Sequence, residues 1–233
     1  TKLGSCRLLG SILPYIIDTP KAPVFILGCQ RSGTTMLDRV FSLSPQISAY
    51  GESGKIMDSG YRMLPDGNIN YLICTSPGSV IVFKPLNESQ HITKILKKNH
   101  NSKVIWIYRN YRDVANSMVA KWGADHVRLI RALASNNRLE RGTSAVAEGI
   151  SPEHRKDLRR ISKLDLSAHD ASAFVWFLRN SLYFENKSDL YQNVLLCKYE
   201  DMVIDPETHF RRIFSFIKAE FSPKFTSGVH RTS

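Results

Sequence analysis

Short apolar runs alternate with longer segments of helical period along this chain of 233 residues. The apolar runs have strand length and occupy residues 24–27, 47–50, 80–83, 104–108 and 194–197. Between and after them, apolar residues recur at helical spacing, most clearly in 36–41, 171–191 and 206–217. Such alternation is typical of βαβ units. It predicts an α/β fold with a central, mostly parallel sheet flanked by helices.

The composition suits a chain with one hydrophobic core, because 42% of the residues are hydrophobic and 23% are charged. We therefore expect a single domain over residues 1–233, with 1–21 as a lead-in segment. Residues 141–168 are basic and polar, and we expect a mobile loop or helical insertion there. We expect no membrane span, since every apolar run is far shorter than the roughly 20 residues that a transmembrane helix needs.

Lysine and arginine outnumber the acidic residues by 32 to 21, which gives a formal charge of +11. This charge implies a polyanionic partner: nucleic acid, an anionic membrane, an acidic polymer or a multiply phosphorylated cofactor. The basic run HRKDLRR at 154–160 is either a solvated helix face or a guide for an acidic acceptor. The four cysteines form no CxxC pair and the histidines lack ligand spacing, so we expect no metal site.

Charged side chains stand directly after the predicted strands. Glu52, Lys84 and Arg109 follow three of the apolar runs, and Arg31 follows the first one within a glycine-bounded loop. In open α/β sheets, ligands bind in the crevice beyond the carboxyl ends of the strands. We therefore expect these four side chains to converge on one crevice.

The loop after the first strand, with the sequence GCQRSGTT, has the outline of a phosphate-binding loop. Glycines let backbone N–H groups face an anion at the start of a helix. The loop departs from the nucleoside triphosphatase pattern G-x-x-x-x-G-K-[ST], because Thr34 stands in place of the lysine and the cation is the earlier Arg31. The topology is therefore P-loop-like, but a triphosphate loses its main cationic contact. The alternative is a plain turn. The candidate anion-binding residues are Arg31, Ser32, Gly33, Thr34 and Thr35.

Two segments resemble the PAPS-dependent sulfotransferases, where PAPS is 3′-phosphoadenosine 5′-phosphosulfate. VFILGCQRSGTTML resembles the family's loop for the 5′-phosphosulfate. VIWIYRNYRDVANSMV resembles its 3′-phosphate segment, which implies that Arg109 and Ser117 bind that phosphate. The chemistry is suitable, because an arginine at a strand end offers a fork of donors and a serine on the next helix adds a hydroxyl. Taken alone, Arg109 has a surface ion pair as its alternative. We expect Asp113 to cap the helix.

A third segment, 198–206, is similar to the family's motif Y-E-D-[LM]-x-x-x-P. The resemblance implies that Tyr199 lies beside the adenine of the nucleotide. The alternative is that Tyr199 only packs the sheet edge against the last helix. Asp205 and Pro206 are residue types of a helix N-cap and first turn, so we expect the last helix to begin there.

The resemblance implies an enzyme that moves a sulfuryl group from PAPS to an acceptor hydroxyl or amine, leaving adenosine 3′,5′-bisphosphate (PAP). Such transfer is an in-line displacement in which charge grows on the bridging oxygen of the leaving group. Preorganised cations and N–H groups stabilise that charge, so we expect that no metal is required. Arg31 and Lys84 are the candidate cations, and the resemblance puts Lys84 near the scissile bond.

Glu52 is the candidate general base. The cytosolic small-molecule branch of the family carries a histidine two residues after the lysine, and here that position holds Leu86. The surroundings of Glu52 resemble the tyrosylprotein and carbohydrate branches, and the chain resembles these and bacterial members more than the cytosolic branch. The alternative is that Glu52 satisfies backbone donors at the start of a helix over 55–64. Glu88 is the reserve candidate.

Two other functions fit parts of the pattern. A P-loop kinase or NTPase-like phosphotransferase shares the topology, but the chain lacks the loop lysine and a strand that ends in a Walker-type aspartate. A basic nucleic-acid-binding module would explain the charge and use the tryptophans for base stacking. We expect no nucleic acid partner, because the cations gather at strand ends.

The sequence leaves the acceptor class open among carbohydrate, peptide tyrosine, lipid and small metabolite. We expect a cytoplasmic enzyme, with the Golgi lumen as the alternative if a membrane anchor has been removed. Members of the family usually continue into a further cofactor-binding loop. We therefore expect either a truncation at the carboxyl end of this chain or a further tail beyond it.

Overall fold

The computed structural model of this protein describes residues 21–98, 101–135 and 146–230. Apart from its last residue, the predicted lead-in 1–21 lies outside the described residues. The first five residues of the predicted insertion 141–168 lie outside them as well.

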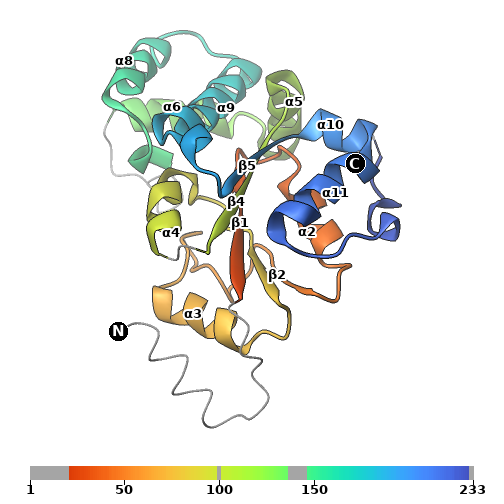
Figure 1. The fold of residues 1–233 in the computed structure, drawn as a ribbon. Helices are drawn as coiled ribbons and strands as arrows, with labels where there is room; N and C mark the ends of the chain where they lie inside the picture. The colour runs from red at the N-terminus through yellow and green to blue at the C-terminus, as the bar shows by residue number, and fades with distance from the viewer. Residues whose placement is uncertain (1–20, 99–100, 136–145, 231–233) are drawn as a thin grey trace.

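Five parallel strands form one sheet in the order β2-β3-β1-β4-β5 (Figure 1). Their bounds are Ala22–Gly28 for β1, Ile47–Tyr50 for β2, Val80–Phe83 for β3, Lys103–Tyr108 for β4 and Val194–Lys198 for β5. All five predicted apolar runs are strands, so the predicted α/β fold with a parallel sheet is confirmed. Because every strand runs the same way, all five carboxyl ends lie along one edge of the sheet, where such folds bind their ligands.

Helices connect the strands and cover the sheet. Their bounds are Thr34–Phe41 for α2, Asp66–Thr75 for α3, Ile92–Lys98 for α4, Tyr111–Trp122 for α5, Asp125–Ala134 for α6, Pro152–Ile161 for α8, Ala168–Glu185 for α9, Tyr199–Ile204 for α10 and Pro206–Ile217 for α11. Three short 3-10 turns add Ser89–His91 (η1), Ser188–Leu190 (η2) and Pro223–Thr226 (η3).

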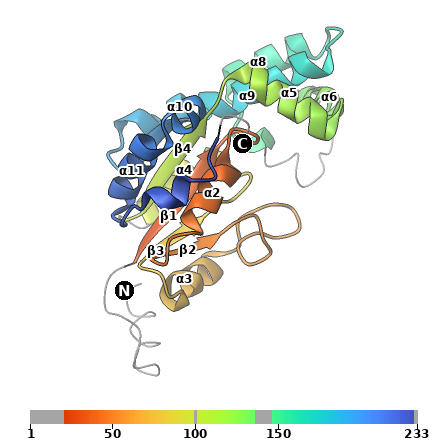
Figure 2. The same ribbon diagram turned by 90° about the vertical axis from the view of Figure 1, so that its right-hand side faces the viewer.

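Helices lie on both faces of the sheet (Figure 2). One face packs against α2, α10 and α11, and the opposite face packs against α3, α4 and the end of α9. A third buried cluster joins α5, α6, α8 and α9. Figure 2 shows this helical group on the side of the strand ends. The crevice at the strand ends is therefore flanked by α2 and α5.

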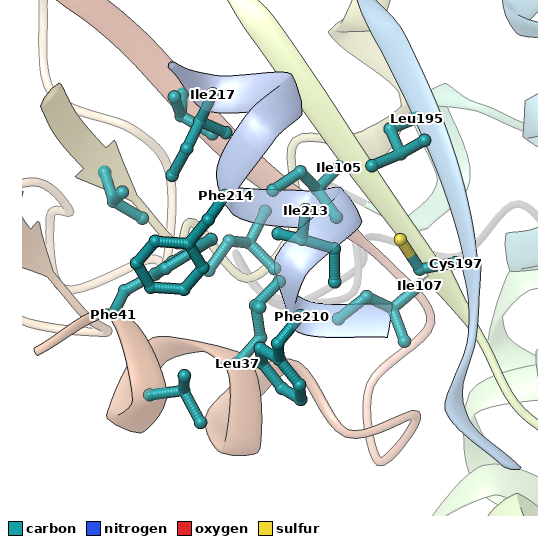
Figure 3. Close-up of a cluster of buried hydrophobic side chains, with 14 of the residues drawn as sticks. Leu37, Phe41, Ile105, Ile107, Leu195, Cys197, Phe210, Ile213, Phe214 and Ile217 are labelled. Atoms are coloured by element: carbon teal, nitrogen blue, oxygen red, sulfur yellow. The ribbon is translucent and has the colours of Figure 1, made fainter. Parts of the chain in front are cut away.

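The last helix confirms the predicted apolar stripe. Phe210, Ile213, Phe214 and Ile217 are all buried, and the Phe214 ring lies 5.5 Å from that of Phe41 on α2 (Figure 3). Burial of each such side chain contributes about 1.5–3 kcal/mol. The predicted N-cap is also present, since the Asp205 side chain accepts a hydrogen bond of 3.2 Å from the Thr208 N–H.

Two local expectations are wrong. Residues 55–64 form turns rather than a helix, because the Asp58 carboxylate accepts the N–H groups of Gly60 and Arg62 at 2.8 and 3.0 Å. Such side-chain bonds to nearby backbone compete with helix formation. The cap of α5 is the Asn110 amide oxygen, which accepts from the Arg112 N–H, and Asp113 lies in the first turn instead.

The basic run 154–160 lies on α8, where most of its side chains are at least partly exposed and Leu158 is buried. The predicted insertion therefore carries helical structure in its described part. Among the described helices, none is both long enough and apolar enough to cross a membrane.

Candidate active site

The phosphate loop is held by two glycines that allow close contacts. Gly28 has a φ of 137°, and a Cβ there would lie 2.3 Å from the Ile107 carbonyl oxygen of β4. Gly33 has a φ of 99°, and a Cβ there would lie 2.3 Å from the ring of Tyr199. A side chain at either position would collide in a backbone conformation that L residues rarely adopt. The predicted turn glycines therefore fix the loop against β4 and the start of α10.

The loop ends at a helix N-terminus without a side-chain cap. Gly33 occupies the N-cap of α2, so the first backbone N–H groups of the helix have no capping side chain. Together with the helix dipole, such N–H groups form an anion-binding site. Thr34 and Thr35 lie in this first turn, as the phosphate-loop pattern predicts. The local geometry suits an anionic group above the loop.

Ser32 and Cys29 lie inside the loop and face the protein interior. Ser32 is fully buried, and its Oγ has no hydrogen-bond partner among the described residues. Burial raises the pKa of the Cys29 thiol to about 12, although the positive charge of Arg179 acts against this shift. The thiol is therefore neutral near pH 7.

One hydrogen bond joins the two predicted phosphate segments. The Arg31 Nε donates to the Ser117 Oγ at 2.9 Å, across 86 positions of sequence. Arg31 has a φ of 68°, a left-handed conformation that turns the loop and is uncommon for a residue other than glycine. The loop after β1 and helix α5 are therefore in direct contact.

Arg109 follows β4 and lies over the ring of Tyr199. Its guanidinium carbon is 4.1 Å from the ring centroid, within the range of a cation–π interaction. Its Nε lies 3.9 Å from the Asp113 carboxylate, is buried and has no hydrogen-bond partner among the described residues. The Arg109 carbonyl accepts from the Trp176 indole at 2.9 Å. Helix α9 thus braces the end of β4, a contact that the sequence did not predict.

Lys84 and Glu52 form an ion pair across two neighbouring strand ends. Only 4% of Lys84 is exposed, whereas the Glu52 side chain is 36% exposed. The backbone N–H of Lys84 donates to the backbone carbonyl of Tyr50 at 3.0 Å, which extends the pairing of β2 and β3 beyond the strands. The structure therefore brings Glu52 and Lys84 together, and it leaves Glu52 open to solvent on one side.

Asp38 on α2 lies near this pair, although the sequence analysis did not single it out. Burial raises the pKa of its carboxyl, Glu52 raises it further, and the charge of Lys84 lowers it. A Cβ on Gly51 would lie 2.9 Å from Asp38 Oδ2, so the carboxylate lies against the residue that precedes Glu52. The sequence signal is an acidic residue on the helix that follows the loop.

Two further predicted residues are buried. Tyr199 is 3% exposed and contacts Gly33 and Arg109. Its contact with adenine stays a prediction. Glu88, the reserve base, is 5% exposed and accepts the Met63 N–H at 3.0 Å. The Glu88 carboxylate thus holds the backbone of the 51–65 loop. Glu52, which is partly exposed, is therefore better placed to reach an acceptor.

Comparisons with known proteins agree with this geometry. The family model described as Sulfotransferase domain matches residues 21–233. Among solved structures, the sulfotransferase domain from the curacin biosynthetic pathway is similar with 16% identity and a TM-score of 0.55, covering 91% of this chain and 81% of that one. The sulfotransferase domain of the Synechococcus PCC 7002 olefin synthase is similar with 15% identity and a TM-score of 0.51, covering 90% of this chain and 78% of that one.

Sulfotransferase STF1 from Mycobacterium tuberculosis H37Rv is similar with 12% identity and a TM-score of 0.52, covering 98% of this chain and 76% of that one. At these identities the likeness to solved structures shows a shared fold alone. Comparison with curated protein sequences finds no match.

Proposed function

Because this chain belongs to the sulfotransferase family, whose members transfer a sulfuryl group from PAPS, we propose specific roles for the residues of its crevice. Arg31, Ser32, Gly33, Thr34 and Thr35 bind the 5′-phosphosulfate, and Arg109 and Ser117 bind the 3′-phosphate. The observation that carries this proposal is the 2.9 Å hydrogen bond from Arg31 to Ser117. One nucleotide can contact both segments only if they line one crevice, and this bond joins them directly.

Two buried polar atoms support the fit of PAPS. The Ser32 Oγ and the Arg109 Nε lack hydrogen-bond partners among the described residues, although the Arg109 Nε lies 3.9 Å from the Asp113 carboxylate. A buried donor without a partner costs about 1–3 kcal/mol, and a hydrogen bond to an anionic oxygen removes this cost. We propose that the 5′-phosphosulfate and the 3′-phosphate of PAPS accept these missing hydrogen bonds. We also propose that Tyr199 contacts the adenine while its ring packs against the Arg109 guanidinium.

The donor supplies the sulfuryl group and a phosphate leaving group. Lys84 and Arg31 provide positive charge where negative charge grows on the bridging oxygen, and the first N–H groups of α2 add to it. These groups are fixed by packing before the reaction: Lys84 is 4% exposed and Arg31 is hydrogen-bonded to α5. Preorganised charge of this kind replaces a metal, so we propose that the reaction requires none.

Glu52 accepts the proton of the acceptor hydroxyl or amine. Its side chain is the partly exposed member of the ion pair with Lys84, so an acceptor can reach it from solvent. A carboxylate in this position acts as a general base when the acceptor's oxygen lies within hydrogen-bond reach. Its partner Lys84 then faces the leaving group. Two adjacent side chains thus act on the acceptor and on the leaving group.

We also propose a place within the family and a cellular setting. Leu86 stands where the cytosolic small-molecule branch has its histidine, and Glu52 is available instead. This combination favours the tyrosylprotein, carbohydrate and bacterial branches. The acceptor stays open among carbohydrate, peptide tyrosine, lipid and small metabolite. The cytoplasm remains our expected compartment, with the Golgi lumen as the alternative.

The decisive experiment is sulfate transfer from labelled PAPS to a panel containing an oligosaccharide, a tyrosine peptide, a hydroxylated lipid and phenols. Labelled product with at least one acceptor is expected, without added metal and in the presence of EDTA. In parallel, PAP should raise the melting temperature more than ATP with magnesium or a DNA oligomer, since a ligand of the native state stabilises it. A preference for ATP with magnesium would overturn the proposal in favour of a phosphotransferase.

A further inference from the structure

The Lys84 ammonium forms an ion pair with one acidic side chain, and a second acidic side chain lies against the backbone just before that partner. It is paired with Glu52, which follows β2. The second acidic side chain is that of Asp38 on α2, whose carboxyl is subject to the charges of both Lys84 and Glu52. The Asp38 carboxylate is also close to the backbone before Glu52, because a Cβ on Gly51 would lie 2.9 Å from its Oδ2.

Asp38 lacks a compensating partner for part of its carboxylate. Its Oδ1 is buried and has no hydrogen-bond partner among the described residues. A buried carboxylate with an unpaired oxygen destabilises a folded protein. Hydrophobic stabilisation of α2 does not require it either, because the apolar contacts of this helix come from Leu37, Val40 and Phe41. The residue therefore calls for a role outside folding.

We propose that Asp38 is a positioning residue that holds the Lys84 ammonium once Glu52 has taken the acceptor's proton. This inference rests on the proposed role of Glu52. When the acceptor O–H bond breaks, its proton moves to the Glu52 carboxylate, which becomes neutral, while the new S–O bond forms and the S–O bond to the phosphate breaks. Lys84 thereby loses its charged partner, and the Asp38 carboxylate is the neighbouring anion that remains.

The burial of Lys84 makes this second anion necessary. Only 4% of the residue is exposed, so water cannot solvate the ammonium well when Glu52 is neutral. A buried charge left without its partner is strongly destabilising. Asp38 keeps the ammonium in place, so that it can donate to the bridging oxygen of the leaving group instead of turning away with Glu52.

The raised pKa of Asp38 has a consequence for stability that can be measured. Burial is its first cause, Glu52 adds to it and Lys84 opposes it. An acid with a raised folded pKa stabilises the fold in its protonated form, fully below the unfolded pKa, and loses that contribution as pH rises through the folded pKa. In its ionised form Asp38 therefore reduces stability in the resting enzyme, where Glu52 already neutralises Lys84.

A double-mutant cycle tests the proposal without any acceptor, because Glu52→Gln imitates the protonated glutamate. With Glu52 present, Asp38→Asn should raise the melting temperature at pH 7 by about 3 °C. In the Glu52→Gln background, the same Asp38→Asn change should lower it by about 6 °C or more, since Lys84 loses its last anion. If both single variants fold and the double variant does not, this result supports the proposal in the same way, because Asp38→Asn then destabilises the protein only in the Glu52→Gln background.

The gain with Glu52 present should also disappear as pH falls below the ordinary carboxyl value of 3.8, where Asp38 is neutral in both states. Asp165→Asn, a change at an exposed position between α8 and α9, is the matched control and should shift neither background. Equal shifts from Asp38→Asn in the two backgrounds would overturn the proposal, because Asp38 would then act independently of Glu52. The proposed sulfotransferase activity would be unaffected by that result, since PAPS turnover is not part of the cycle.

For the reaction itself, Asp38→Asn should lower kcat at least tenfold at saturating PAPS, with the dissociation constant of PAP changed less than twofold. Asp38→Glu should restore part of the rate, because it returns the charge. A purely structural role would change stability alone and would give neither the kcat loss nor the rescue.

Discussion

The proposed donor side and the proposed acceptor side of the site differ in how their polar groups are satisfied. The donor side, which comprises Arg31, Ser32, Arg109 and Ser117, is joined by a hydrogen bond and keeps two buried atoms without partners. The acceptor side, Glu52 and Lys84, is already neutralised by its own ion pair. Donor binding can thus fill vacant hydrogen-bonding positions on a fixed frame, whereas the acceptor must displace a partner before the reaction proceeds.

This contrast suggests that the two sides control different kinetic quantities. Groups that bind the donor equally in the ground state and the transition state contribute to affinity, and groups whose interaction changes during the reaction contribute to turnover. The donor side should therefore control the affinity for PAP, except that Arg31 also acts on the bridging oxygen, and the acceptor side should control kcat. Four substitutions can break or sharpen this division.

The largest effect is expected from Glu52→Gln. Loss of a general base lowers turnover by about 10²–10⁴-fold. The dissociation constant of PAP should change less than twofold, because Glu52 lies on the acceptor side. Initial rates with labelled PAPS and calorimetric titration with PAP measure the two quantities. Glu153→Gln, at an exposed position of α8, is the control. Turnover at the wild-type rate would return Glu52 to a purely structural role beside Lys84.

Arg109→Ala tests the donor side. A hydrogen bond to a charged group contributes about 1.5–3 kcal/mol, so the affinity for PAP should fall by about 10- to 100-fold. The control is Arg112→Ala, which removes a more exposed arginine from the same helix start and should leave the affinity within twofold. Both dissociation constants are measured by calorimetry. Equal losses in the two variants would mean that net charge, rather than the position of Arg109, determines the affinity.

Gly33→Ala tests whether the donor side is a fixed frame. The new Cβ would collide with the Tyr199 ring at a φ of 99°, so the free energy of unfolding should fall by more than about 1 kcal/mol. Gly54→Ala is the matched change on the acceptor side, where no atom lies within 4 Å, and it should stay within about 0.5 kcal/mol. Urea unfolding measures both. A similar loss of unfolding free energy in both variants would indicate that the phosphate loop rearranges as easily as the 51–65 segment.

The fold was predictable from the sequence wherever burial alone decides the structure. The apolar run 80–83 matches β3 residue for residue, because a strand buried on both faces consists of continuous apolar residues. The run 47–50 matches the bounds of the edge strand β2, although only Ile47 is buried there. Residues 55–64 were predicted wrongly, since the turn there depends on the Asp58 carboxylate bonding to nearby backbone. That local competition leaves no trace in hydrophobic periodicity.

The site was predictable to the same depth. The rule that ligands bind beyond parallel strand ends predicts Arg31, Glu52, Lys84 and Arg109 at one edge of the sheet, and their convergence on one ligand stays a prediction. The ion pair of Glu52 with Lys84 requires in addition that β2 and β3 be neighbours, and strand order is not written in the apolar pattern. Asp38 was missed for a related reason. The proposed role of Asp38 depends on the contact of its carboxylate with Gly51, the residue before Glu52. This contact joins two segments that belong to different elements of the fold.

The smallest effect is expected from Ser117→Ala, and it sharpens the comparison most. Ser117 accepts a hydrogen bond from Arg31, so its removal loosens the contact between the two phosphate segments as well as one proposed ligand contact. Because the hydroxyl itself carries no charge, its hydrogen bond to a charged group should contribute about 1.5 kcal/mol, the lower end of the range for such bonds, which corresponds to a rise of about 12-fold in the dissociation constant of PAP. Ser135→Ala, at the exposed end of α6, should change it less than twofold.

The kinetic readout separates the two roles of Ser117. If the hydroxyl only binds the 3′-phosphate, kcat at saturating PAPS should be unchanged, because the loss is uniform binding. If it also positions Arg31 beside the bridging oxygen, kcat should fall together with the affinity. We expect the second result, since the Arg31 Nε has its 2.9 Å hydrogen bond to Ser117 before any ligand binds. A drop in affinity with full kcat would confine Ser117 to the donor's 3′ end and leave Arg31 to be positioned by the loop alone.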